Sequence, residues 1–68
     1  MTTLWINGEK REVAGPVGTV AELLVVIGLP ADGTLVEQNG LALFPRDFAV
    51  IPVVENDRFE FVRIAAGG

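Results

Sequence analysis

The 68-residue sequence contains no cysteine and no histidine. Without cysteine there is no disulfide, no thiolate metal ligand and no thiol nucleophile. Without histidine the chain lacks the commonest general base and metal ligand. The glycines match no phosphate-binding loop. The carboxylates Glu9, Glu12, Glu37, Glu55, Asp57 and Glu60 show no acid–base spacing and are interpreted as solvated surface groups. We therefore expect no catalytic residue, no metal site, no cofactor bound by this chain, and no enzymatic activity of its own.

Positive charge is also scarce, with five Lys and Arg residues against nine Asp and Glu and a net charge of −4. Only Lys10 and Arg11 are adjacent, so the sequence has no basic stripe of the kind that binds phosphate backbones. No apolar run approaches the roughly 20 residues that cross a bilayer, and the N-terminus lacks a signal-peptide pattern. We expect a cytoplasmic protein that binds neither nucleic acid nor membrane.

Half of the residues are hydrophobic, and their pattern predicts one small domain over residues 1–64. The Asn-Gly dipeptides at 7–8 and 39–40 are typical of tight hairpin turns, because both residue types tolerate positive φ. A helical turn is expected at 47–49, and Asn56 suits a left-handed turn position. The strands are predicted at 4–6, 11–14, 35–38, 41–44 and 58–64.

Residues 19–28 carry the signals of a short helix. Thr19 and Glu22 match a capping box, in which each side chain accepts a hydrogen bond from the other residue's backbone amide. Gly28 stands where a left-handed residue commonly ends a helix. An apolar stripe lies between these signals at helical spacing, formed by Val20, Leu23, Leu24 and Ile27. A helix of about two turns is not stable alone, so it must pack on a sheet.

In the last predicted strand, Phe59 and Phe61 share one face. Because aromatic side chains bury the most area per residue, we expect this face to meet the helix. The last strand would then be central and paired with the first. The fold class is α+β, a two-layer arrangement of a mixed sheet with one helix on one face. The predicted core consists of Leu4, Ile6, Val20, Leu23, Leu24, Ile27, Phe59 and Phe61.

Alternation along the strands places Trp5, Val62 and Ile64 on the opposite face of the sheet. If the first and last strands are neighbours, these side chains form one exposed apolar patch. Such patches often mark surfaces that dock a partner protein. The alternative is that a loop, such as 45–54, covers them.

The given sequence ends in Ala65, Ala66, Gly67 and Gly68, directly after the last predicted strand. Glycine reaches backbone conformations that are closed to other residues, so such a segment can thread a narrow channel in another protein. We expect residues 65–68 to form a flexible tail that presents the α-carboxylate of Gly68. The alternative is a frayed terminus without a role.

Several short motifs, taken in their order, resemble those of the ThiS family. They are Thr-Val-Ala-Glu-Leu-Leu at 19–24, Asn39-Gly40, Pro45-Arg46, the turn at 55–58 and Gly67-Gly68. ThiS proteins are small sulfur carriers of thiamine biosynthesis with the β-grasp fold that ubiquitin and MoaD share. The resemblance extends over essentially the whole chain, and it implies a ubiquitin-like β-grasp fold with a mixed sheet of four or five strands and one helix.

The resemblance also implies a function. A ThiF-like enzyme would use ATP to adenylate the Gly68 carboxylate, and a sulfur donor protein would convert the adenylate into a thiocarboxylate. The thiocarboxylate would deliver sulfur to a ThiG-like thiazole synthase. Ala65, Ala66 and Gly67 would thread the active site of the partner, beside the docking patch of Trp5, Val62 and Ile64. The nucleotide would be bound by the activating enzyme.

Three other functions remain open at this point. A MoaD-like carrier for molybdopterin or another cofactor would use the same tail chemistry with a different acceptor, although such chains are usually longer. A ubiquitin-like modifier would form an isopeptide bond with lysine. A plain binding module would carry an inert tail.

Overall fold

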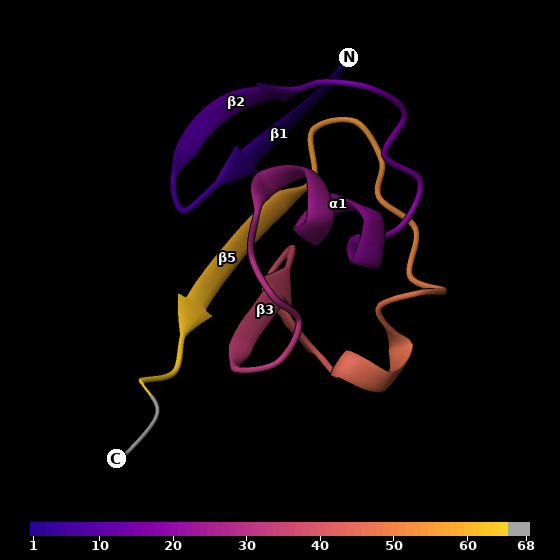
Figure 1. Ribbon diagram of the computed structural model, residues 1–68. Helices are drawn as coiled ribbons and strands as arrows, with labels where there is room; N and C mark the ends of the chain where they lie inside the picture. The colour runs from indigo at the N-terminus through magenta and orange to yellow at the C-terminus, as the bar shows by residue number, and fades with distance from the viewer. Residues whose placement is uncertain (66–68) are drawn as a thin grey trace.

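In the computed structural model, which describes residues 1–65, a five-stranded mixed sheet carries one α-helix across one face (Figure 1). This confirms the predicted two-layer α+β architecture. A short 3-10 helix, η1, spans Pro45–Asp47. The remaining elements are β1 (Thr2–Ile6), β2 (Glu9–Val13), α1 (Val20–Ile27), β3 (Thr34–Gln38), β4 (Leu41–Leu43) and β5 (Arg58–Arg63).

The last strand is at the centre of the sheet, as the sequence predicts. The strand order is β2-β1-β5-β3-β4. β5 runs parallel to β1, with Ile6 beside Phe59, and antiparallel to β3, with Val36 beside Phe61. The segment that leads to the end of the chain is therefore hydrogen-bonded on both sides.

Both Asn-Gly dipeptides form two-residue hairpin turns. All four residues have positive φ, from 50° at Asn7 to 84° at Gly8, as a type I′ turn requires. The first turn pairs Ile6 directly with Glu9, so β2 begins at Glu9. The expected start at residue 11 was wrong, because the turn geometry, and not strand propensity, fixes where pairing resumes.

The predicted helix signals are confirmed at both ends of α1. The Glu22 amide donates to the Thr19 hydroxyl at 3.2 Å, and the Thr19 amide donates to Glu22 Oε1 at 2.9 Å. Gly28 ends the helix in the left-handed region, with φ of 80°. No helix within residues 1–65 has the length and apolar character needed to cross a membrane.

The segment after η1 packs against the N-terminus of α1. The Val20 amide donates to the Ile51 carbonyl and the Ala21 amide to the Phe48 carbonyl, each at 3.0 Å. These bonds satisfy amide groups that the first turn of a helix leaves without partners. The expected helical turn at 47–49 instead starts earlier, at Pro45. Residues 48–53 thus complete the helix side of the domain and do not cover the opposite sheet face.

The core lies between α1 and the sheet. Every predicted core residue is buried except Ile27, which is partly buried and packs against the others. The rings of Phe59 and Phe61 stack with centroids 5.5 Å apart. Within residues 1–65, five further buried hydrophobic residues were not predicted, and they are Val13, Val17, Val36, Phe48 and Val53.

Candidate functional site

The candidate site is the end of β5, where the chain leaves the sheet. β5 ends at Arg63, and Ile64 and Ala65 follow as exposed residues outside regular structure. Figure 1 shows this end of β5 pointing away from α1 and from the β1–β2 hairpin. The predictions for Ala66, Gly67 and Gly68 concern residues outside the described part of the chain.

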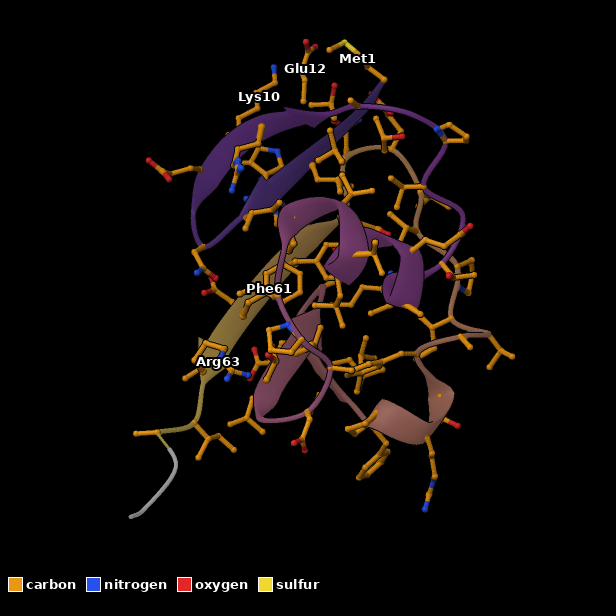
Figure 2. The ribbon with its side chains drawn as sticks, in the orientation of Figure 1. Met1, Lys10, Glu12, Phe61 and Arg63 are labelled. Carbon is orange, nitrogen blue, oxygen red and sulfur yellow. The ribbon has the colours of Figure 1, made fainter. Side chains whose placement is uncertain are left out.

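The loop at 31–34 holds the base of this segment. The Ile64 amide donates to the Gly33 carbonyl at 2.8 Å. Arg63 Nη1 donates to the Asp32 carbonyl at 2.7 Å and to the Thr34 hydroxyl at 3.0 Å, and Figure 2 shows the Arg63 side chain at the end of β5. A Cβ on Gly33 would lie only 3.1 Å from Arg63 Nη1. The direction in which the chain leaves the sheet is therefore set by side-chain and backbone contacts.

Asn7 holds β5 from the other side. Its amide donates to the Phe59 carbonyl at 2.9 Å. Its side chain donates to the Phe61 carbonyl at 3.3 Å and accepts from the Phe61 amide at 2.8 Å. These contacts extend the bonding along β5 beyond the last paired residue of β1.

An apolar patch lies beside the base of the tail on the sheet face opposite α1. Val62 and Ile64 were predicted there and are 55% and 53% exposed, and the neighbouring Leu35 is 56% exposed. Leu35 is the cross-strand partner of Val62. Leu35 was not predicted to lie here, although alternation along β3 turns it away from the side on which Val36 is buried. We call Leu35, Val62 and Ile64 the tail-side patch.

Trp5 lies apart from the tail-side patch, which corrects the predicted three-residue surface. It is paired with Arg58, whose guanidinium carbon lies 4.7 Å from the centre of the indole ring, and it is only partly exposed. Val62 follows Arg58 by four residues along β5, or about 13 Å at the usual rise of a strand. The separation arises because β1 is paired with only the first part of β5.

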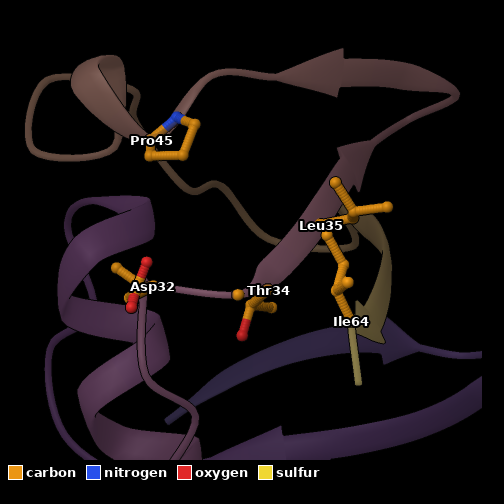
Figure 3. Close-up of a pocket in the computed structure, with 7 residues that line it drawn as sticks. Asp32, Thr34, Leu35, Pro45 and Ile64 are labelled. Carbon is orange, nitrogen blue, oxygen red and sulfur yellow. The ribbon is translucent and has the colours of Figure 1, made fainter. Parts of the chain in front are cut away.

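A hollow of about 340 Å³ opens next to the tail-side patch. Figure 3 shows the side chains of Leu35 and Ile64 next to each other, with Pro45 across the hollow. Its lining is completed by the 31–34 loop that also holds Arg63. The arrangement offers an apolar recess to a side chain of a partner, close to the point where the tail begins.

Comparison with known proteins connects this geometry with one family. No protein-family model and no curated protein matches the sequence. Among solved structures, the crystal structure of the thiamine biosynthesis protein ThiS from Geobacter metallireducens has a TM-score of 0.83 and 32% identity, covering 98% of this chain and all of that one. The chain belongs to the ThiS family.

A second structure of the ThiS family gives the same result. The NMR solution structure of a thiamine biosynthesis protein from Geobacter metallireducens has a TM-score of 0.81 and 32% identity, with coverage of 98% of this chain and 88% of that one. The sheet and helix described above are therefore the β-grasp fold of the ThiS family, as the resemblance implied.

In this member of the ThiS family, the acidic residue that directly precedes β5 is structural. Asp57 is 5% exposed, so its interpretation as a solvated surface group was wrong. Its carboxylate accepts hydrogen bonds from Gln38 Nε2, Asn39 Nδ2 and the Val54 amide, each at 2.9 Å. Both oxygens are engaged, and the carboxylate ties the turn that precedes β5 to the β3–β4 hairpin.

Metal-binding side chains do not converge in this ThiS-family fold. Within residues 1–65, no group of three or more His, Cys, Asp or Glu residues is placed to hold a metal ion. The features that do converge near the end of β5 are a fixed strand end, an apolar patch and a recess. This combination fixes the direction in which the chain leaves β5 and places an apolar surface beside it.

Proposed function

We propose that this chain is a sulfur carrier in thiamine biosynthesis. The observation that carries the proposal is the match to ThiS from Geobacter metallireducens, a thiamine biosynthesis protein, at 32% identity over 98% of this chain. The described part of the chain supports it, because the strand that precedes the tail is the central strand of the sheet.

In the proposed reaction, the α-carboxylate of Gly68 is the group that is acted upon. It attacks the α-phosphate of ATP in a ThiF-like enzyme, which gives an acyl adenylate and releases pyrophosphate. A persulfide on a sulfur donor protein then displaces AMP, and cleavage of the sulfur–sulfur bond by a thiol leaves a thiocarboxylate. The thiocarboxylate delivers its sulfur to a ThiG-like thiazole synthase. The enzymes supply the nucleotide site and the catalytic groups, and the reactions take place in the cytoplasm.

The role of this chain is to present its terminus. Ala65, Ala66 and Gly67 carry minimal side chains, so the segment passes through a narrow channel to the partner's active site. The bonds of Arg63 and Ile64 to the 31–34 loop fix where that segment starts. Fixing the base reduces the conformational freedom that is lost when the tail enters the channel.

The tail-side patch is the proposed docking surface. Leu35, Val62 and Ile64 are each more than half exposed and adjoin the recess at Pro45. Burying this apolar area against the partner would orient the tail toward the active site. Trp5, at the other end of β5, would contribute at the margin of the interface.

Intact mass spectrometry tests the proposal. The purified chain is incubated with a ThiF-like enzyme of the same organism, ATP and a sulfur donor. We expect a mass increase that corresponds to replacement of one oxygen by sulfur, with loss of the change when Gly68 is deleted. A variant that lacks Met1 is the matched control and should react like the original chain. An unchanged mass in the presence of an enzyme active on its own carrier would contradict the proposal.

The acceptor is tested separately. A chain that has acquired the thiocarboxylate should support thiazole formation by a ThiG-like enzyme. If the thiocarboxylate instead transferred its sulfur to a molybdopterin precursor, the chain would be a MoaD-like carrier. Conjugates of high mass that resist thiols would identify a protein modifier.

A further inference from the structure

Two carboxylates face each other on the open side of the sheet. Glu37 of β3 and Glu60 of β5 are direct cross-strand partners, and both are exposed. Like charges directly opposite each other destabilise a sheet. The fold therefore retains an arrangement that is unfavourable for the isolated chain.

Among residues 1–65, the nearest cationic side chains on β5 are engaged away from this pair. Ala42 is the partner of Glu37 on β4. Arg58 precedes Glu60 by two residues on the same face of β5, and its guanidinium is stacked over Trp5, on the β1 side. Arg63 is bonded to the 31–34 loop. The carboxylate pair is thus open to a positive group from outside the chain.

The pair directly adjoins the tail-side patch. Leu35 and Val62, which are also cross-strand partners, form the next row on the same face. Two residues along a strand span about 7 Å, so one partner surface can contact both rows. This face consequently combines a negative row with an apolar row and the recess beside Ile64.

This pattern selects among the possible occupants of the face. A second copy of the chain, packed around a two-fold axis, would place two such pairs against each other. Four carboxylates in one desolvated contact are strongly unfavourable. A partner with a basic side chain next to apolar side chains is complementary in both rows.

We propose that Glu37 and Glu60 together receive a Lys or Arg side chain of the adenylating partner enzyme, while that enzyme's apolar side chains cover Leu35, Val62 and Ile64. The inference rests on the proposed function and assigns the charge that its partner must carry. The repulsion between the two glutamates is relieved only in the complex, so the pair favours this partner over neutral or acidic surfaces.

The test uses the full chain with the double substitution E37Q/E60Q and the matched control E9Q. Glu9 is exposed but lies on edge strand β2, opposite Ile6. Adenylation is followed by pyrophosphate release at several concentrations of chain and of sodium chloride. We expect E37Q/E60Q to raise KM for the chain about tenfold, with kcat unchanged and a weaker dependence of KM on salt. E9Q should behave like the original chain.

Thermal unfolding of the same variants separates docking from a structural role. Because the substitution removes a repulsion, E37Q/E60Q should unfold at the same temperature as the original chain or higher. A higher KM accompanied by a lower unfolding temperature would overturn the inference, as would an unchanged KM with unchanged salt dependence. Dimerisation of the original chain through this face, detected by sedimentation and abolished by E37K, would overturn it as well. Failure of the proposed function is distinguishable, because the original chain itself would then not be adenylated.

Discussion

The side chain of Asn7 hydrogen-bonds to the backbone of Phe61 in the way that a further backbone residue of β1 would. The side-chain amide donates to the Phe61 carbonyl at 3.3 Å, and the side-chain oxygen accepts from the Phe61 amide at 2.8 Å. The backbone cannot make these bonds, because at this point it turns back into β2 with φ of 50° at Asn7. One residue therefore serves both the first hairpin and the parallel contact that holds the central strand.

Removing the Asn7 side chain should destabilise the domain. We expect Asn7→Gly, which tolerates the positive φ, to lower the free energy of unfolding by about 1–2 kcal/mol through the lost bonds to Phe61. Asn7→Ala should lower the free energy of unfolding by about a further 1 kcal/mol, because alanine adopts the positive φ of this position only at a cost. Urea denaturation measures both. Equal stability of Asn7→Gly and the original chain would show that the side-chain bonds are dispensable.

Asp57 should be far more sensitive than the exposed glutamates. Asp57→Ala leaves the partly buried donors of Gln38, Asn39 and Val54 without the carboxylate that accepts from them, which we expect to cost about 2–4 kcal/mol. Glu12→Gln is the control, because Glu12 is exposed and should change stability by less than about 0.5 kcal/mol. Denaturant titration gives both values. If Asp57→Ala lowered the free energy of unfolding by less than about 0.5 kcal/mol, as a surface substitution does, the structural role of Asp57 would be contradicted.

Gly33→Ala should release the base of the tail. Gly33 has φ of 77°, and an added Cβ would lie 3.1 Å from Arg63 Nη1. Gly15 has the same φ with nothing within 4 Å of an added Cβ, so Gly15→Ala carries the backbone cost alone, about 1 kcal/mol. We expect faster hydrogen exchange of the Ile64 amide in Gly33→Ala than in Gly15→Ala. Similar exchange in both variants would argue against contact with Arg63 as the cause.

The hydroxyl of Thr19, which caps the N-terminus of α1, should contribute to the stability of the domain. Thr19→Ala removes the acceptor of the Glu22 amide and should lower the free energy of unfolding by about 1 kcal/mol. Thr19→Ser keeps a hydroxyl and should retain most of that stability. Thermal or urea unfolding distinguishes the two. If both substitutions cost the same, the loss comes from the threonine methyl group and not from the cap.

Local features were predictable because short-range chemistry fixes them. The Thr19–Glu22 capping box, the left-handed Gly28 and the two Asn-Gly turns depend on neighbouring residues only. The central position of β5 was also predictable, since Phe59 and Phe61 need a buried face and a strand buried by the helix lies in the middle of a sheet. These features alone led to the two-layer α+β fold.

Other features depend on contacts between distant segments. Phe48 lies in an irregular segment without periodicity, and its burial follows from bonds of that segment to the N-terminus of α1. Asp57 is indistinguishable in sequence from the exposed acidic residues until Gln38, Asn39 and Val54 surround it. The start of β2 was misplaced because hairpin register follows the turn.

The candidate site shows the same division. Residue order placed Val62 and Ile64 next to the tail, and alternation placed them outward. Only the strand pairing separated Trp5 from them, joined Leu35 to them and set Glu37 opposite Glu60.

By itself, then, the sequence determined the turns, the helix limits and the face that each strand residue occupies, because these depend on backbone preferences and a period of two or 3.6 residues. The tertiary structure decided which strands are neighbours and in what register. Strand order and register depend on contacts between segments that are far apart in the chain. These contacts create the Glu37–Glu60 pair, the tail-side patch and the fixed base from which the tail starts.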